Sequence, residues 1–569
     1  MRVRLLFLVL LLASPSYAEL VIEGVDAELQ RNVRSYVALA GESCDAESWL
    51  IRRRFRTISS EVKTALEPFG YYDPVIETAL DQSGDCWSAT IRIDAGQPVL
   101  LRQVSISLDA PVEDRSNFDD VLAAPTLKPN NRLRHADYAL LKESLQVRAA
   151  ERGYIEAIFL ENSINVWPEE LAADLNLKFK TGPRYNFGEI ALEQSLLDER
   201  LVRAFLEFEP GMPYDNRLLT KAYDDLSRSG YFGRIELIPQ FEQAADQRLP
   251  MLITLEPAAR IEYTVGLGLS TDTGPRARAG FQNRRVNQRG HRLQADLSVS
   301  SVLQGLSAEY RRPLADPRSE WLSYTSAITR ESTDSSDSDN ARVGARRSKR
   351  IRPEWMRTLF IDLRYERFNI GDVDSDSRLV LPGIVYDHKR SNRDVYPTRG
   401  RRLTSELRGT AELLGSNTSF LQTIASARLV RSPSEDSRIL ARITVGLTAQ
   451  SEFLELPPSM RFFAGGDESV RGFGYETLGP VDDQGNVVGG RNLLTASIEY
   501  ERHLRGDFFG AVFVDAGNAF DKFDVDPAVG AGIGLIWRSP VGPLRVYLAH
   551  PLNKSDRNVR LHIQLGADL

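Results

Sequence analysis

Residues 261–569 alternate apolar and polar side chains, and this pattern limits the fold more than any other feature of the chain. In the first segment the residues between the apolar positions are polar or glycine, and the apolar positions themselves are Ile261, Tyr263, Val265, Leu267 and Leu269. A period of two is typical of a β-strand with one apolar and one wet face. Similar segments of about ten residues recur to the end of the chain between turn-forming residues. We therefore expect an all-β region.

The polar face of these strands distinguishes between two all-β folds. A soluble β-sandwich buries one face of each sheet, and that face would not carry so many charges. A membrane β-barrel averages out to moderate polarity, and the mean hydropathy of this chain is −0.29. After the N-terminus no apolar run approaches the roughly 18 residues that a membrane helix needs. The alternation therefore predicts a transmembrane β-barrel.

The connections between the predicted strands differ in character. Some are compact, such as residues 315–318 and 432–436, whereas residues 332–340 and 371–378 are longer and highly polar. We interpret the compact ones as turns on the inner side of the membrane and the polar ones as larger loops outside.

One connection, residues 461–491, is exceptional in length. It lies between alternating segments at Ile439–Ser451 and Leu493–Glu501, and a connection this long is usually functional or disordered. It contains Arg471, Gly472 and Phe473 in succession, so a cation lies at a flexible joint beside an aromatic ring. Pattern alone leaves open that this is an exposed loop whose arginine is simply hydrated.

Residues 19–257 follow a different pattern that repeats. A Gly-Tyr pair occurs at Gly70, Gly153 and Gly230, at intervals of 153 − 70 = 83 and 230 − 153 = 77 residues. Each pair follows a segment with apolar residues at helical spacing, and the glycine can end that helix with a positive φ. Two alternating segments come next. The apolar residues of the three helical segments are Ile51, Phe55, Ile58, Val62 and Leu66; Tyr138, Leu141, Leu145 and Ala149; and Leu218, Ala222 and Leu226. Each copy is expected to be a β-α-α-β-β unit.

Residues 1–18 have the features of a secretory signal peptide: Arg2 and Arg4, an apolar run, and a small-residue cleavage site ending at Ala18. In an exported protein, the two cysteines Cys44 and Cys86 are expected to form a disulfide, since no further ligand residues stand at metal-binding spacing. Two independent thiols are the alternative.

Composition and motifs exclude several functions. The chain has 71 Lys and Arg against 78 Asp and Glu, interspersed throughout, which does not suggest nucleic-acid binding. It has no hydrolase, zinc-protease or phosphate-loop motif, so we expect neither an enzyme nor a cofactor or metal.

Three C-terminal blocks carry a family resemblance. They are Phe463-Ala464-Gly465-Gly466 followed by Arg471-Gly472-Phe473; Phe513 to Asn518; and Gly530 to Gly534 followed by Ser539 to Arg545. Behind three tandem units, this order resembles the outer-membrane assembly-factor superfamily, whose periplasmic repeats are POTRA domains. Within it the chain is most similar to the TamA family, the outer-membrane subunits of translocation and assembly modules, since the main assembly factor has five repeats and two-partner transporters usually have two.

The resemblance implies a domain organisation. A signal peptide (1–18) precedes POTRA 1 (19–96), POTRA 2 (97–182) and POTRA 3 (183–257), and residues 258–569 form a barrel of 16 antiparallel strands. Residues 461–491 fold back into the lumen, where Arg471, beside Gly472 and Phe473, meets Glu499 and Asp515.

The resemblance also implies a weak seam where the first strand, Ile261–Ser270, meets the last, residues 559–569. Glycines weaken a strand, so we expect the seam to involve Tyr263, Thr264, Gly266, Gly268, Leu565 and Gly566. The glycines could instead relieve crowding inside the barrel.

The resemblance implies a factor in the outer membrane of a Gram-negative bacterium that inserts client proteins such as autotransporters into the bilayer through the seam. POTRA 1 would contact an inner-membrane-anchored, TamB-like partner, and POTRA domains bind extended partners by adding a strand to a sheet edge. The alternative is a conducting pore or a dedicated secretion channel of the two-partner type.

Overall fold

The computed structural model describes residues 18–84, 86–123, 126–270, 274–333, 336–371, 373–393, 395–450, 453–522, 525–539, 542–553 and 558–565. The predicted signal peptide lies outside the described residues except for Ala18. The chain forms two compact units: the first holds residues up to Ala191 with parts of the third repeat, and the second holds the rest of that repeat with all of the C-terminal sheet. Among the described residues, no helix is long and apolar enough to cross a membrane.

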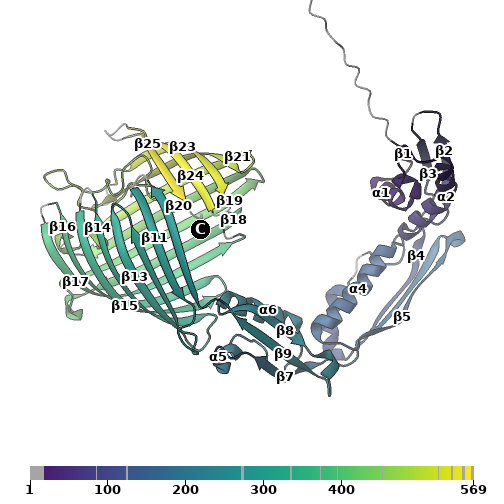
Figure 1. Cartoon of the computed structure of the whole chain (residues 1–569), viewed down its shortest axis with the longest axis horizontal. Helices are drawn as coiled ribbons and strands as arrows, with labels where there is room; N and C mark the ends of the chain where they lie inside the picture. The colour runs from purple at the N-terminus through teal and green to yellow at the C-terminus, as the bar shows by residue number, and fades with distance from the viewer. Residues whose placement is uncertain are drawn as a thin grey trace, which may run out of the picture. The chain divides into compact units, whose positions relative to one another are not determined.

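The N-terminal region contains three β-α-α-β-β repeats, as the sequence predicts (Figure 1). The first consists of β1 (Glu19–Glu23), α1 (Ala27–Tyr36), α2 (Ser48–Leu66), β2 (Val75–Asp81) and β3 (Ser88–Asp94). The second consists of β4 (Leu100–Asp109), α3 (Asp119–Leu122), α4 (His135–Arg152), β5 (Ile158–Trp167) and β6 (Ala172–Lys180). The third consists of β7 (Asn186–Glu193), α5 (Glu199–Arg203), α6 (Asn216–Ser229), β8 (Phe232–Pro239) and β9 (Arg248–Pro257).

Each repeat has a three-stranded sheet whose last strand is central, in the orders β1-β3-β2, β4-β6-β5 and β7-β9-β8. The predicted helical stripes form the cores, with Ile51, Ile58, Val62 and Leu66 buried in the first repeat. In the third helix the buried position is Leu219 and not Leu218, which is only partly buried. The three predicted helix-ending glycines have φ values of 87°, 86° and 67°.

Cys44 and Cys86 form a disulfide with their Cα atoms 4.9 Å apart. The bond joins the segment before α2 to the segment before β3, and thereby closes a loop around α2 and β2. In a repeat this small, such a crosslink is worth about 3–4 kcal/mol of stability in the chain-entropy account.

The C-terminal region is a 16-stranded antiparallel sheet in which every strand pairs with its sequence neighbours from β10 to β25. Figure 1 shows the sheet rolled into a barrel. The strands are β10 (Ile261–Ser270), β11 (Gly274–Asn283), β12 (Arg292–Val299), β13 (Leu303–Pro313), β14 (Glu320–Ser332), β15 (Ser336–Arg352), β16 (Trp355–Ile370), β17 (Val373–Ser391), β18 (Arg399–Thr410), β19 (Phe420–Ser434), β20 (Ser437–Gln450), β21 (Asn492–Arg505), β22 (Phe508–Phe520), β23 (Ala528–Ser539), β24 (Gly542–Pro551) and β25 (Arg560–Leu565).

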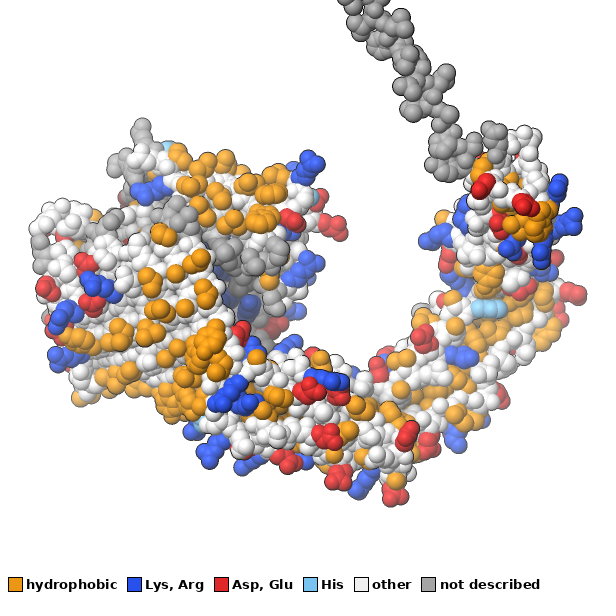
Figure 2. Space-filling model, in the orientation of Figure 1, with side chains coloured by type: hydrophobic (Ala, Val, Ile, Leu, Met, Phe, Trp, Pro, Cys, Tyr) orange, Lys and Arg blue, Asp and Glu red, His pale blue; other side chains and the backbone are white. Residues whose placement is uncertain are grey.

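The alternation that predicted the strands separates the two faces of the barrel. Apolar side chains such as Leu363, Leu407 and Ile498 are exposed on the outer surface, and Figure 2 shows patches of hydrophobic side chains spread over the face of the barrel toward the viewer. Charged residues such as Asp362 and Glu366 are buried on the inner face. The outer face can therefore contact lipid while the inner face binds polar groups.

The expected large polar loops at 332–340 and 371–378 are wrong. The described residues of these segments belong mainly to ladders: Ser332 pairs with Asp337 between β14 and β15, and Ile370 pairs with Val373 between β16 and β17. The strands extend past the apolar belt, where water can solvate polar side chains while the backbone stays paired. Polarity therefore did not distinguish these strands from loops.

Candidate functional site

The segment 461–491 folds into the barrel lumen. It pairs with itself through bridges between Phe462 and Gly490 and between Ala464 and Leu478. Its side chains and backbone also reach strands far apart in the sheet, because the Tyr475 hydroxyl lies 3.2 Å from Glu331 of β14 and the Gly472 N–H lies 3.0 Å from His562 of β25. A segment that contacts both of these strands crosses the interior, so the alternative of an exposed loop is wrong.

Arg471 is the centre of this site and is only 3% exposed. Its Nε and Nη2 donate to the two carboxylate oxygens of Asp515 at 2.7 and 2.9 Å, and its backbone N–H donates to the same carboxylate at 3.0 Å. Its Nη1 donates to Glu499 at 2.6 Å. The structure thus brings together the three side chains that the sequence analysis had associated, in the bidentate geometry that favours arginine over lysine.

The wall beneath Arg471 consists of cross-strand neighbours. Ser497 lies opposite Asp515, and Glu499 lies opposite Phe513, on β21 and β22. The guanidinium carbon lies 3.5 Å from the centre of the Phe513 ring, and Ser497 accepts a weaker hydrogen bond at 3.3 Å. Period-two alternation therefore places both acids and the ring on one inner face, where a single cation can contact them all.

Two glycines allow the loop to approach this wall. Gly472 has a φ of +98°, a conformation that other residues rarely adopt. A Cβ at Gly530 of β23 would lie 1.9 Å from the carbonyl oxygen of Arg471, so only glycine fits there. Phe473 is buried with Ala464, Val470, Leu478 and Ala528 in a small apolar cluster that fixes the other side of the turn.

The sequence analysis missed two residues of this site, Tyr547 and His562. The Tyr547 hydroxyl donates to the second oxygen of Glu499 at 2.7 Å, and the Tyr547 ring lies 4.5 Å from the Arg471 guanidinium carbon. His562 is 1% exposed and accepts the Gly472 N–H at Nε2, so its Nδ1 carries the proton that binds Asp467. Alternation in the last strand marks His562 as inward-facing, but nothing in the sequence names its partner.

β10 and β25 are the first and last strands of the sheet, between which the sequence analysis predicts a seam. Within the described ranges, β10 pairs with β11 along its whole length and no ladder joins β10 to β25. β25 pairs with β24 only between Leu544 and Ala549. Over the residues that the structure describes, β10 and β25 therefore lie near each other without a ladder of backbone hydrogen bonds between them.

The structure describes the predicted seam residues of β10 fully and those of β25 only in part. Tyr263 is 73% exposed on the outer face, and Thr264 lies opposite Gly280, where a Cβ would meet the threonine hydroxyl. A Cβ at Gly266 would meet nothing within 4 Å, and at Gly268 it would meet only the flexible Arg276 side chain. Crowding therefore does not require these glycines. Leu565 ends β25 with its side chain outside the described part, and Gly566 lies outside it altogether.

A cavity of about 110 Å³ opens beside Arg471 and is lined by charged residues of the loop and wall, including Arg442, Asp467 and Glu499. In the described part of the chain no group of His, Cys, Asp and Glu is arranged to hold a metal ion. The site is therefore an ion-pair and hydrogen-bond latch between the loop and the barrel wall, and we call Arg471, Glu499, Asp515, Tyr547 and His562 the loop latch.

Comparison with known families agrees with this architecture. A family model for the Omp85 superfamily domain matches residues 286–568, and one for the first POTRA domain of TamA matches residues 19–95. The barrel and its inserted loop fall within the first match.

Similar proteins include two curated outer membrane protein assembly factors named BamA. The chain is 21% identical over 410 residues to that of Nitratidesulfovibrio vulgaris, covering 68% of this chain and 51% of the relative. It is 21% identical over 603 residues to that of Neisseria meningitidis serogroup B, covering 91% of this chain and 74% of the relative. The chain thus spans about half the length of the first of these relatives.

Among solved structures, BamA from Haemophilus ducreyi lacking POTRA domains 1–3 superposes with a TM-score of 0.70 at 16% identity, covering 82% of this chain and 99% of that structure. This likeness confirms the fold of repeats followed by a barrel. The two family matches place the barrel in the outer membrane of a Gram-negative bacterium and the repeats in the periplasm. The chain belongs to the Omp85 superfamily, with POTRA domains ahead of its barrel.

Proposed function

We propose that this protein is an outer-membrane assembly factor that inserts client β-strands through the seam between β10 and β25. The observation that carries the proposal is the strand edge of β10. Its ladder with β11 covers ten residue pairs, from Ile261–Asn283 to Ser270–Gly274, while its other edge has no ladder among the described residues. A free edge in hydrocarbon costs several kcal/mol for each unpaired backbone group, so this edge favours pairing with an incoming strand.

The exposure of β10 supports this role. Val265 and Leu267 are each 81% exposed, more than the 67% of Ile328 in the middle of the sheet. An incoming amphipathic strand would cover these side chains and satisfy the backbone of β10 in one step. The exchange of hydrogen bonds requires no nucleotide.

A disulfide clamp tests this proposal directly. With Cys44 and Cys86 replaced by serine, Tyr263→Cys is combined with cysteine at Leu561 or Ile563 of β25, which face outward as Tyr263 does, and the pair that crosslinks is kept. Oxidation should abolish insertion of a client barrel into liposomes. A matched control places the disulfide between Val265 and Ala279, which lie opposite each other in the β10–β11 ladder. Full insertion by the clamped seam variant would refute the role of the seam.

The finer assignment is to the TamA family, with autotransporters among the clients and a TamB-like, inner-membrane-anchored partner contacting the first repeat. It is supported by the match of residues 19–95 to the first POTRA domain of TamA and by the number of repeats. We expect the partner to add a strand to the edge strand β2, where Val75 is 65% exposed. Photocrosslinkers at Val75 and Glu77 should capture this partner, whereas crosslinkers on β5 of the second repeat should not.

The channel alternative has less support. The folded loop occupies the lumen from β14 to β25, and its core residues Val470 and Phe473 are buried. A plugged lumen should give low and intermittent conductance in planar bilayers. A large steady conductance of the purified protein would favour a channel over an assembly factor.

A further inference from the structure

One half of the barrel carries a row of cations on its outer face. β10 begins directly after the third repeat, so the end of the barrel at Ile261 faces the periplasm. At that end of β13–β19, outward positions carry the residues that we call the periplasmic basic row: Arg312, Arg347, Lys349, Arg357, Arg390, Arg399, Arg401 and Arg431.

The orientation of these residues follows from the strand alternation. Arg401 shares its face with Leu403 and Leu407, which are 39% and 42% exposed on the outer surface. Arg431 shares its face with Leu429, which is 49% exposed. Since side chains two apart lie on one face of a strand, the row lies outside the barrel, next to the apolar belt.

The ladders place several of these cations directly opposite one another. Lys349 lies opposite Arg357, Arg390 opposite Arg401, and Arg399 opposite Arg431. Like charges facing each other across a strand pair destabilise a sheet. Three such pairs on contiguous strands indicate that an anion outside the protein offsets the repulsion.

Few acids of the protein neutralise the row. Glu320 pairs with Arg347 at 2.5 Å and with Lys349 at 3.7 Å, and Glu354 pairs with Arg390 at 3.2 Å. In the part of the chain that the structure describes, no ion pair involves Arg357, Arg399, Arg401 or Arg431. The repulsion within Lys349–Arg357, Arg390–Arg401 and Arg399–Arg431 is therefore only partly relieved from within the chain.

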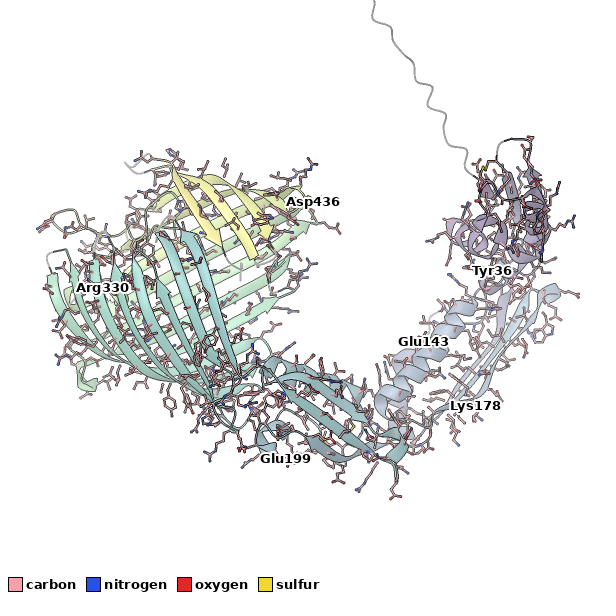
Figure 3. All side chains as sticks on the ribbon, in the orientation of Figure 1. Tyr36, Glu143, Lys178, Glu199, Arg330 and Asp436 are labelled. Carbon is pink, nitrogen blue, oxygen red and sulfur yellow. A yellow bond between two sulfur atoms is a disulfide. The ribbon has the colours of Figure 1, made fainter. Side chains whose placement is uncertain are left out.

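Among the described residues, the row does not continue into the seam half of the barrel. Outward positions at the periplasmic end of the strands flanking the seam carry mostly apolar side chains, with cations at Arg502 and Arg505: Ile261, Leu293, Ile439, Phe508, Trp537 and Leu544. The opposite end of β14–β17 is mixed in charge, since Arg330 faces Asp339 and Arg367 and Arg378 share their strand ends with Asp374 and Asp376. Figure 3 labels Arg330 and Asp436, which mark the two ends of the barrel.

We infer that the periplasmic basic row binds the phosphate groups of anionic phospholipids in the inner leaflet of the outer membrane. Cations that border an apolar membrane surface lie at headgroup level, where anionic lipids attract them. Arginine suits phosphate because its planar fork donates two parallel hydrogen bonds. Trp355 and Tyr386, on the same outer face, are of the type that marks a membrane interface.

Native mass spectrometry of the full-length protein tests this inference. The protein in detergent is incubated with equal amounts of phosphatidylglycerol and phosphatidylethanolamine, and retained lipids are counted. Wild type should retain phosphatidylglycerol preferentially, and the preference should fall as ionic strength rises. In R357Q/R401Q/R431Q the apparent affinity for phosphatidylglycerol should fall about fivefold for each removed cation.

The matched control, R330Q/R367Q/R378Q, removes the same number of arginines from the outer face at the other end of the barrel and should keep the wild-type preference. Heat-modifiable gel mobility verifies that each barrel is folded. If the triple variant does not fold, R401Q alone and the salt titration of wild type decide the question. Equal retention of both lipids by wild type would overturn the inference, because it would show that the row does not select anionic phospholipids. An equal loss in both triple variants would also overturn it.

Discussion

At the scale of single residues, the loop latch joins a cation and two acids that are all nearly excluded from water. Asp515 is fully buried and Glu499 is 5% exposed, and each carboxylate binds Arg471. Removing one partner of such a group leaves an uncompensated buried charge, which costs about 3–5 kcal/mol. The same geometry is hard to regain with lysine, which cannot bind Asp515 through two nitrogens while also reaching Glu499.

We predict that Arg471→Ala releases the loop from the wall, with Arg471→Lys giving a smaller effect of the same kind. Limited proteolysis should cut residues 461–491 faster in both variants, and client insertion should decrease while the barrel stays in the membrane. Arg428→Ala is the matched control, because its pair with Glu468 lies in the same region but is largely exposed. Unchanged protease resistance in Arg471→Ala would contradict the latch.

His562 gives a second prediction at this scale. His562→Ala leaves the buried Gly472 N–H without its acceptor, at a cost of about 1–3 kcal/mol. Hydrogen exchange at residues 466–474 should accelerate, and β25 should become easier to crosslink to β10 or to a client. His550→Ala, on the exposed face of the neighbouring strand β24, should leave both unchanged. An identical exchange pattern in the two variants would show that His562 does not tie the loop to the last strand.

At the scale of elements, the first two repeats meet in a joint of defined geometry. The Tyr72 hydroxyl lies 2.7 Å from Nε2 of His135 at the start of α4, and the Val99 N–H donates to Gly70 at 2.8 Å. A Cβ at Gly70 would lie 2.5 Å from the Leu133 carbonyl oxygen, so the glycine that ends one repeat also lets the next approach. Burial lowers the pKa of His135 below its ordinary value of 6.5, although Glu67 opposes the change.

This pKa shift makes the joint sensitive to pH. Because the folded joint binds the proton less well than the unfolded chain, its stability is complete above about pH 6.5 and is lost as the pH falls toward the lowered pKa. The protection factors for hydrogen exchange at residues 70–72 and 133–136 of the full-length protein, corrected for the slower intrinsic exchange at acidic pH, should therefore be lower at pH 5.5 than at pH 7.5. His135→Gln should remove this difference. A pH response that persists in His135→Gln would assign it to another group.

The sequence predicts an element well when the residues that determine it lie within that element, and poorly when they lie far away in the chain. The bounds of β10 and the buried stripe from Ile51 to Leu66 follow from periodicity, which each segment carries in itself. The polar ends of β15 and β17 were misassigned because strand pairing in water leaves no apolar signal. Arg471 could be matched to its acids only through family resemblance, and His562 lies 90 residues from Gly472, beyond any local pattern.

At the scale of the whole molecule, the second compact unit joins part of the third repeat to the barrel. Arg318, in the turn between β13 and β14, binds Glu207 at 2.5 Å, Asp225 at 3.7 Å and Asp316 at 2.9 Å. Tyr231 donates to the carbonyl of Gly290, and a Cβ at Gly290 would meet the Leu201 side chain at 2.6 Å. Burial raises the pKa of Asp225, with Arg318 and Lys221 acting against it.

We predict that Arg318→Ala loosens this attachment by roughly 1–3 kcal/mol, toward the low end because the groups are partly solvated. Hydrogen exchange should accelerate at residues 192–207 and 221–237 and remain unchanged inside the strands. Arg203→Ala, which removes an exposed pair with Glu199 on α5, is the control. Equal exchange in both variants would mean that the ion pairs of Arg318 do not hold the third repeat to the barrel.

The disulfide of the first repeat also determines when that repeat can reach its full stability. Thiols stay reduced in the cytosol, so the bond between Cys44 and Cys86 can close only after the repeat reaches the periplasm. Until then the repeat lacks a crosslink worth about 3–4 kcal/mol, and a chain that folds less stably before export is easier to keep unfolded for passage across the inner membrane. The disulfide then forms in the oxidising periplasm, where the repeat functions. A cell unable to form disulfides would export the protein with its first periplasmic repeat lacking this crosslink.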